Sequence, residues 1–176
     1  MLIVDAQIHL WNAGNPTSPW HRQIPAYLKE DALKEMDAGG VDAAILTPHT
    51  PWDPNANELC MEAARAHPDR FAILGNFPLD KPESRSLVDT WKQRPGMLGC
   101  RFTFIGPEQS KWPTDGSVDW LWPAAERAGL PIATGRMRNA SRRGFFIETD
   151  YGELQAHQRV LCELHAAGRS GGDPRR

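Results

Sequence analysis

The predicted fold rests on one stretch near the start of the chain, Leu2-Ile3-Val4-Asp5-Ala6-Gln7-Ile8-His9-Leu10-Trp11. Apolar and polar residues alternate toward its end, which is the pattern of a strand that is buried in a sheet and carries polar side chains on one face. In this pattern Asp5, Gln7 and His9 share a face, and Gln7 and His9 converge at the carboxyl end of the strand. We therefore predict a functional site at this strand end, with His9 as its central residue.

Strand and helix patterns alternate along the following part of the chain. Strands are predicted over 41–47, 71–77, 97–104 and 129–134, and helices from 28 to a stop at 39–40, and over 57–67, 83–93 and 119–128. Such an alternation is typical of right-handed βαβ units around a parallel sheet. An open doubly wound sheet and a (β/α)8 barrel both satisfy it. The glycine fingerprint of a dinucleotide site follows none of the strands, which disfavours a doubly wound oxidoreductase.

Three further side chains are candidates for the same site. His49 and Trp52 lie in a proline-rich loop that directly follows the second predicted strand. Arg101 stands in the middle of an apolar strand, where a charged side chain needs a partner or water. We expect it either to pair with a carboxylate such as Asp5 or to point into a wet site.

The opening strand, together with 96–104 and 114–131, resembles the amidohydrolase-related proteins. Within that family it is similar to the subgroup of lactonases that includes pyrone dicarboxylate and sugar lactonases. The resemblance implies a (β/α)8 barrel whose first strand usually carries His-x-His, a pair that holds a divalent metal such as zinc or manganese in many relatives. Here Gln7 stands in the first position and is a much poorer ligand than imidazole, so His9 alone remains as a candidate metal ligand.

The resemblance also implies a function. It predicts a hydrolase that acts on a lactone or another cyclic ester of a small carboxylate compound. His9 and Gln7 would then be catalytic, and Arg101, His49 and Trp52 would bind the substrate. The alternative, from a different class, is a non-catalytic truncated remnant or a small-molecule binding module that keeps half of the site. The two hypotheses differ because only the hydrolase requires a carboxylate that faces His9.

The chain changes character near residue 134. Residues 135–176 contain eight Arg, no Lys and five acidic residues, whereas all seven Trp precede them. A complete barrel usually needs about 250 residues, so we predict that a partial barrel over 1–134 is truncated after about strand 5. The Arg-rich tail has the pattern of one helix over 152–167 and a disordered end. Exposed strand edges predict self-association, and the missing late strands predict little hydrolase activity.

Composition limits the remaining classes. The net charge of -2 and a hydrophobic content of 40% indicate a soluble domain rather than a nucleic-acid binder. No apolar run is long enough for a membrane span and no secretory leader is recognisable, so a cytoplasmic protein is expected. The three cysteines are far apart and odd in number, which argues against a disulfide framework.

Overall fold

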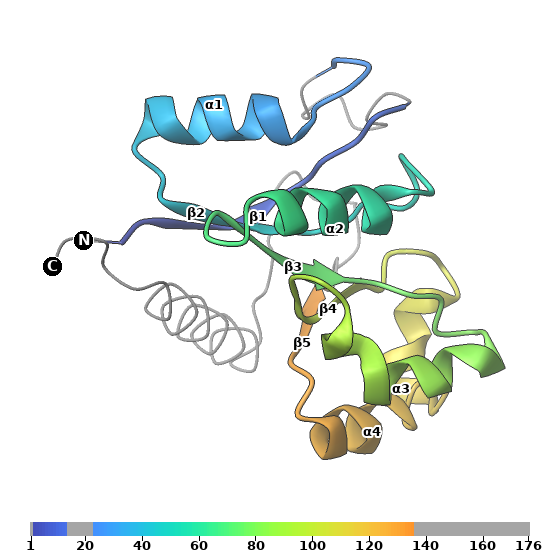
Figure 1. Ribbon diagram of the computed structural model, residues 1–176. Helices are drawn as coiled ribbons and strands as arrows, with labels where there is room; N and C mark the ends of the chain where they lie inside the picture. Colours follow the sequence, from blue (N-terminus) through green and yellow to red (C-terminus); the bar gives the residue numbers. More distant parts are fainter. Residues whose placement is uncertain (1, 14–22, 136–176) are drawn as a thin grey trace, which may run out of the picture.

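A curled sheet of five parallel strands forms the centre of the molecule (Figure 1). The computed structural model describes residues 2–13 and 23–135. The strands are β1 (Val4–Ile8), β2 (Ala43–Leu46), β3 (Phe71–Gly75), β4 (Met97–Thr103) and β5 (Ile132–Gly135). They pair in chain order, β1-β2-β3-β4-β5. A doubly wound sheet reverses its strand order, so the sequential order identifies part of a (β/α)8 barrel, as the sequence pattern and resemblance predicted.

Helices connect the strands on the outside of the curl (Figure 1). They are α1 (Lys29–Gly39), α2 (Ala56–Ala66), the 3₁₀ helix η1 (Pro82–Gln93), the 3₁₀ turn η2 (Gln109–Lys111), α3 (Trp112–Asp115) and α4 (Leu121–Ala128). The four predicted helices are confirmed in place, and Pro123 lies in the first turn of α4, where it leaves the helix intact. The two short elements η2 and α3 were not predicted.

The segment between β3 and β4 differs from the expected α-helix. It is wound as a 3₁₀ helix that begins at Pro82 and contains two serines, Ser84 and Ser86. The Ser86 hydroxyl donates to the Glu83 carbonyl at 2.8 Å, and such bonds between serine side chains and the backbone compete with the α-helical ladder. The segment still buries Val88 and Trp91 against the core, and its bounds agree with the helix predicted over 83–93.

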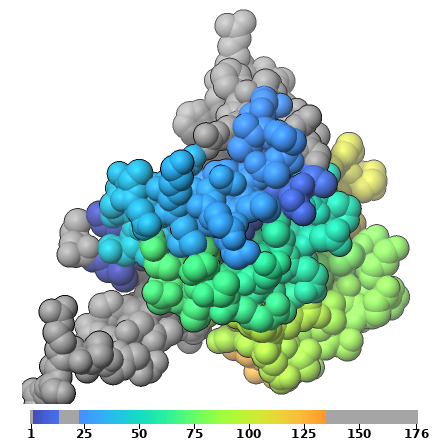
Figure 2. All heavy atoms as spheres, turned by 45° about the horizontal axis from the view of Figure 1, so that its top comes forward, coloured from blue at the N-terminus to red at the C-terminus, as the bar shows by residue number. Residues whose placement is uncertain are grey.

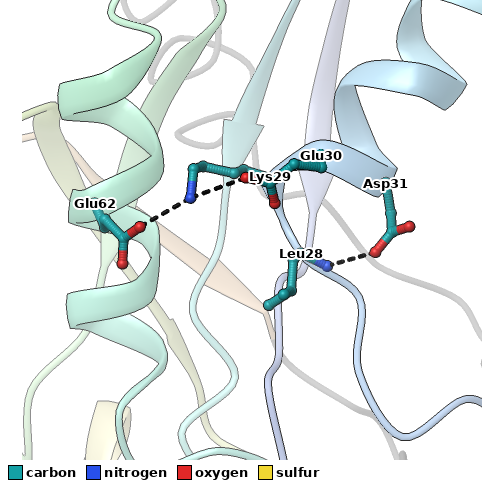
Figure 3. Close-up of polar contacts among 5 residues, drawn as sticks. All are labelled: Leu28, Lys29, Glu30, Asp31 and Glu62. Atoms are coloured by element: carbon teal, nitrogen blue, oxygen red, sulfur yellow. Dashed lines mark hydrogen bonds and ion pairs between the residues drawn. The ribbon is translucent and has the colours of Figure 1, made fainter.

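Neighbouring helices are also joined at their surfaces. Figure 2 shows the blue residues of α1 lying against the teal residues of α2, with the green segments beyond them. Figure 3 shows Lys29, at the start of α1, reaching Glu62 on α2 at 2.8 Å. In the same turn the Asp31 carboxylate accepts the Leu28 N–H at 3.1 Å and caps the first turn of α1. These exposed contacts align the two helices but contribute little to stability.

Two apolar clusters lie on opposite faces of the sheet. The larger one fills the space between strands and helices and includes Leu46, Ile73 and Cys100. The smaller one lies on the inner face of the curl and consists of Ile45, Leu74 and Ala133, with Val4 and Leu98 packed against it. Inward side chains from successive strands are the packing expected of a barrel interior.

The first strand does not alternate as regularly as its sequence suggests. Val4 packs against the inner cluster, whereas Ile8 packs against the helix-side cluster. The pairing of β1 with β2 shifts between Asp5 and Ile8, which inserts one extra residue into β1. Such a bulge re-aims the side chains that follow it, so the expected common face of Asp5, Gln7 and His9 is interrupted after Asp5.

Two predictions lie outside the described residues: the Arg-rich tail over 135–176, of which only Gly135 is described, and the helix over 152–167. Within the described ranges no helix combines the length and apolar character that a membrane crossing requires.

Gly99 provides a test of the packing between β4 and β5. A Cβ at this position would lie 2.4 Å from the Pro131 carbonyl oxygen and 3.0 Å from Leu74 Cδ2. We expect Gly99→Ala to lower the free energy of unfolding by roughly 1–3 kcal/mol, because backbone cannot move aside cheaply. Gly39→Ala is the matched control, since its nearest atom, Val41 Cγ2, is 3.8 Å away. Urea unfolding should leave the control unchanged or slightly more stable; equal midpoints for both variants would contradict this packing.

The buried thiols predict a loss of stability at high pH. Burial, with a smaller effect of the Asp53 carboxylate, raises the pKa of Cys60 to about 12, and burial also raises the pKa of Cys100. The unfolded chain releases these protons near pH 9, whereas the folded chain retains them. Stability contributed by the neutral Cys60 thiol is therefore present below pH 9 and falls between about pH 9 and 12. The neutral Cys100 thiol changes stability in the same direction. Unfolding of Cys60→Ala across this range should show a weaker pH dependence, and an unchanged slope would refute the assignment.

Candidate functional site

The carboxyl ends of the first four strands bring polar side chains to the inner face of the sheet. Ile8, Leu46, Ile73 and Cys100 pack on the helix side. Because neighbours along a strand alternate in direction, His9, Thr47 and Arg101 turn to the opposite face. Catalytic and binding residues of (β/α)8 barrels come from these strand ends.

Two strands hold the His9 ring. Its Nδ1 donates to the Thr47 carbonyl oxygen at the end of β2. The Thr47 hydroxyl oxygen lies 3.1 Å from the same nitrogen and itself donates to the Ile8 carbonyl at 3.3 Å. A carbonyl only accepts, so Nδ1 carries the proton. In the neutral ring, Nε2 is therefore the acceptor atom.

Gln7 approaches that acceptor. Its Nε2 lies 3.5 Å from His9 Nε2, so the amide of Gln7 donates a long hydrogen bond to the imidazole. Two side chains separated by one residue thus converge on one point, as the sequence predicted. Gln7 is exposed and His9 is half-buried, which places this pair at the edge of the inner face rather than within the core.

An aromatic group covers one side of His9. His49 and Trp52, both from the loop after β2, stack with ring centres 3.9 Å apart and planes inclined by 26°. His9 meets both rings edge-on, at 5.5 Å from His49 and 5.4 Å from Trp52. Trp11, in the segment that follows β1, contacts Trp52 with ring centres 5.8 Å apart. The predicted residues His9, Gln7, His49 and Trp52 are therefore brought together.

Asn76 anchors the loop that carries His49. From the end of β3, its side chain donates to the Pro48 carbonyl at 2.7 Å and accepts from the Thr50 hydroxyl at 3.4 Å. Asn57 on α2 in turn binds the backbone of Asn76, donating to its carbonyl at 2.8 Å and accepting its N–H at 3.3 Å. The residues on both sides of His49 are thus fixed to β3.

Asp53 fixes the same loop from the other end. Its side chain is 3% exposed, and its two oxygens accept the N–H groups of Asn12 and Asn55, at 3.0 and 2.9 Å. Hydrogen bonds of this kind are what allow a carboxylate to be buried. Asn12 follows β1 and Asn55 precedes α2, so this one side chain connects the loops after β1 and β2.

Arg101 occupies a different part of the inner face. It is half-buried on β4, opposite Ala133 of β5 in the strand register. Three strand spacings separate β1 from β4, roughly 14 Å along the sheet and less across its curve. The Asp5 carboxylate accepts the Gln7 N–H at 2.9 Å. The sheet order therefore places Arg101 and Asp5 on strands that are not neighbours.

Sequence reasoning did not include Thr47, Asn76 and Asp53 among the site residues. Thr47 and Asn76 each stand at or just after a strand end, and that position was available as a signal. Asp53 stands three residues before the start of α2 within the loop of His49 and Trp52. Nothing in its sequence position indicates that its carboxylate binds a segment 41 residues away.

The described side chains do not complete a metal site. Within 2–13 and 23–135 no group of three His, Cys, Asp or Glu side chains is arranged to hold an ion. His9 Nε2 offers one donor atom, and the Gln7 amide beside it is a weak ligand. A zinc or manganese ion would therefore need ligands beyond these two residues.

The fold resembles several solved structures. A probable 2-pyrone-4,6-dicarboxylic acid hydrolase from Acinetobacter baumannii shares 15% identity, with a TM-score of 0.54 over 76% of this chain and 49% of that one. A 5-carboxyvanillate decarboxylase from Novosphingobium aromaticivorans, complexed with manganese, shares 18% identity, with a TM-score of 0.59 over 76% and 50%. An amidohydrolase from Burkholderia multivorans shares 19% identity, with a TM-score of 0.52 over 67% and 42%. A second crystal form of the last protein contains zinc.

No protein-family model matches the sequence, and no curated protein is similar to it in sequence. The chain spans about half the length of the first two of these structures. At such low identity the similarity concerns the fold alone. The sequence resemblance and the strand order nevertheless agree, and the described chain is a partial (β/α)8 barrel similar to structures of the amidohydrolase family.

Proposed function

We propose that this chain carries the site of an amidohydrolase-type hydrolase that opens a lactone or another cyclic ester of a small carboxylate compound. The observation that supports the proposal most is the state of His9. Its proton is held on Nδ1 by the Thr47 carbonyl, and its acceptor Nε2 lies beside the Gln7 amide. An acceptor and a donor next to each other at a strand end suit the attack of water on a carbonyl group.

The hydrolysis assigns one task to each group. The attacking water gives its proton to His9 Nε2, and its oxygen bonds to the carbonyl carbon. The Gln7 amide donates to the negative oxygen that develops on that carbon. The ring C–O bond then breaks, and the departing oxygen takes up the proton from His9, which leaves an open-chain hydroxy acid. The Thr47 carbonyl stabilises the positive imidazole during this exchange.

The other predicted residues would orient the substrate. Arg101 is a guanidinium on the inner face, and it would bind a substrate carboxylate with two parallel hydrogen bonds. The stacked rings of His49 and Trp52 would form an apolar wall beside the reacting carbonyl. Because Arg101 and His9 lie on different strands, a substrate with its carboxylate several bonds from the ester carbonyl fits this arrangement best.

The second candidate function is that of a small-molecule binding module. Asp5 and Asp53, the carboxylates that flank the site, are bound to backbone N–H groups. These carboxylates therefore stabilise the local backbone rather than activate a water molecule. If the carboxylate that the family uses to activate water is essential, His9, Gln7 and Arg101 would bind a carboxylate compound without turning it over.

An assay of the intact chain separates these functions. A panel of pyrone dicarboxylates and aldonolactones should be opened slowly by the chain, and His9→Ala should lower the rate by about 10²- to 10⁴-fold, the usual effect of losing a general base. Arg101→Lys should raise KM more than it lowers kcat, because lysine cannot form the two parallel bonds. The rate of hydrolysis is measured from the protons that the reaction releases.

His67→Ala is the matched control. His67 caps the carboxyl end of α2 and makes an edge contact with Phe71, so its loss should leave turnover unchanged. Binding of a panel compound without turnover would favour the binding module. Turnover that survives in His9→Ala would refute the hydrolase mechanism, and the absence of both binding and turnover would refute both functions.

The metal content gives an independent test of Gln7. We expect purified protein to hold less than one zinc or manganese ion per chain, because one imidazole and one amide make a weak site. Gln7→His should raise zinc binding, since it supplies a second imidazole beside His9. Gln93→His is the control, because it places a new histidine at an exposed position at the end of η1. Elemental analysis after dialysis measures the result, and one tightly held ion in the unmodified chain would contradict the expectation.

A further inference from the structure

The two loops that build the site meet through one buried carboxylate. Asp53 belongs to the loop after β2, and its Oδ2 accepts the N–H of Asn12 in the loop after β1. Its other oxygen accepts the N–H of Asn55, which precedes the first turn of α2. Asp53 is only 3% exposed, whereas Asn12 and Asn55 are exposed, so the acceptor side of both bonds is shielded from water.

The segment between His49 and Asp53 is one tight turn. The N–H groups of Trp52 and Asp53 both donate to the His49 carbonyl, at 2.9 and 3.2 Å. The same turn stacks the Trp52 ring on the His49 ring. A displacement of Asp53 therefore moves Trp52 and His49 with it.

The other end of the carboxylate bond lies in the loop after β1. Asn12 directly follows Trp11, whose ring contacts Trp52 at 5.8 Å and whose N–H and carbonyl pair with Tyr27. The hydrogen bond from Asn12 to Asp53 thus lies beside the contact between the two tryptophans. Trp52 also meets His9 edge-on.

We propose that Asp53 is a positioning residue that joins the loops after β1 and β2 and so fixes the His49–Trp52 pair against His9. Two oxygens are needed, because the two N–H donors belong to separate segments. An asparagine at this position would offer one oxygen and one NH₂ group, and the NH₂ group would face a backbone N–H. The consequence for substrate affinity rests on the proposed function, whereas the ring geometry does not.

The test compares the intact protein with Asp53→Asn by NMR. In Asp53→Asn we expect weaker ring contacts between His9 and Trp52, shifted His49 ring signals and faster hydrogen exchange at the amide that loses its acceptor, Asn12 or Asn55. Binding of 2-pyrone-4,6-dicarboxylate should weaken by up to about tenfold, because the His49–Trp52 pair that would contact it is no longer held in one position. Ser84→Ala is the control, because Ser84 is also buried but lies in η1.

The outcomes separate this proposal from the proposed function. Unchanged ring contacts and exchange rates in Asp53→Asn, or equal changes in Ser84→Ala, would overturn the positioning role. If the intact protein does not bind the probe but the ring contacts loosen in Asp53→Asn, the positioning role stands and the proposed substrate is wrong. If Asp53→Asn does not fold, hydrogen exchange at the backbone amides of the intact protein tests the positioning role instead. Protection of the Asn12 and Asn55 amides together with observed ring contacts supports the role, and exchange of the Asn12 amide at the rate of an open loop refutes it.

Discussion

The parallel pairing of consecutive strands is the constraint on which the rest of the structure depends. Each strand of the sheet pairs with the next one along the chain, so every carboxyl end lies on the same rim. His9 and the loop of His49 and Trp52 are neighbours for this reason, although about 40 residues separate them. The pairing also explains why Thr47 meets His9: in the β1–β2 register, Ile8 lies opposite Leu46, and the next residue of each strand follows at the rim. The histidine is thus oriented by the backbone of the neighbouring strand, and only in part by side chains.

The periodicity of apolar residues and the positions of glycine and proline made much of this fold predictable. Apolar runs marked the positions of the strands, and glycine or proline marked the ends of the helices, as Gly40 does with its left-handed conformation after α1. Strand order was not predictable from periodicity, because it depends on contacts between distant segments. The winding of η1 was also missed, since the pattern that buries Val88 and Trp91 suits an α-helix and a 3₁₀ helix alike.

The candidate site also has parts that the sequence predicted and parts that it did not. His9 and Gln7 were predictable because they lie on one strand, where spacing alone sets their convergence. His49 and Trp52 were placed near a strand end, but their stacking depends on a turn that sequence does not specify. Asp53 and Asn76 act between segments, so their hydrogen bonds became visible only with the fold. The direction of Arg101 follows from alternation along β4, whereas its distance from His9 depends on the curl of the sheet.

Asp5 has a consequence for assembly. Its carboxylate accepts the N–H of Gln7 on β1, which lies at one side of the five-stranded sheet. An unpaired edge N–H invites a foreign strand, and an aspartate that occupies this donor protects the edge by charge and by hydrogen bonding. A strand that paired with this N–H would have to displace the carboxylate, and it would thereby free Gln7, one of the two catalytic candidates. The Gln7 N–H can therefore either orient Gln7 through Asp5 or pair with an added strand, but it cannot do both.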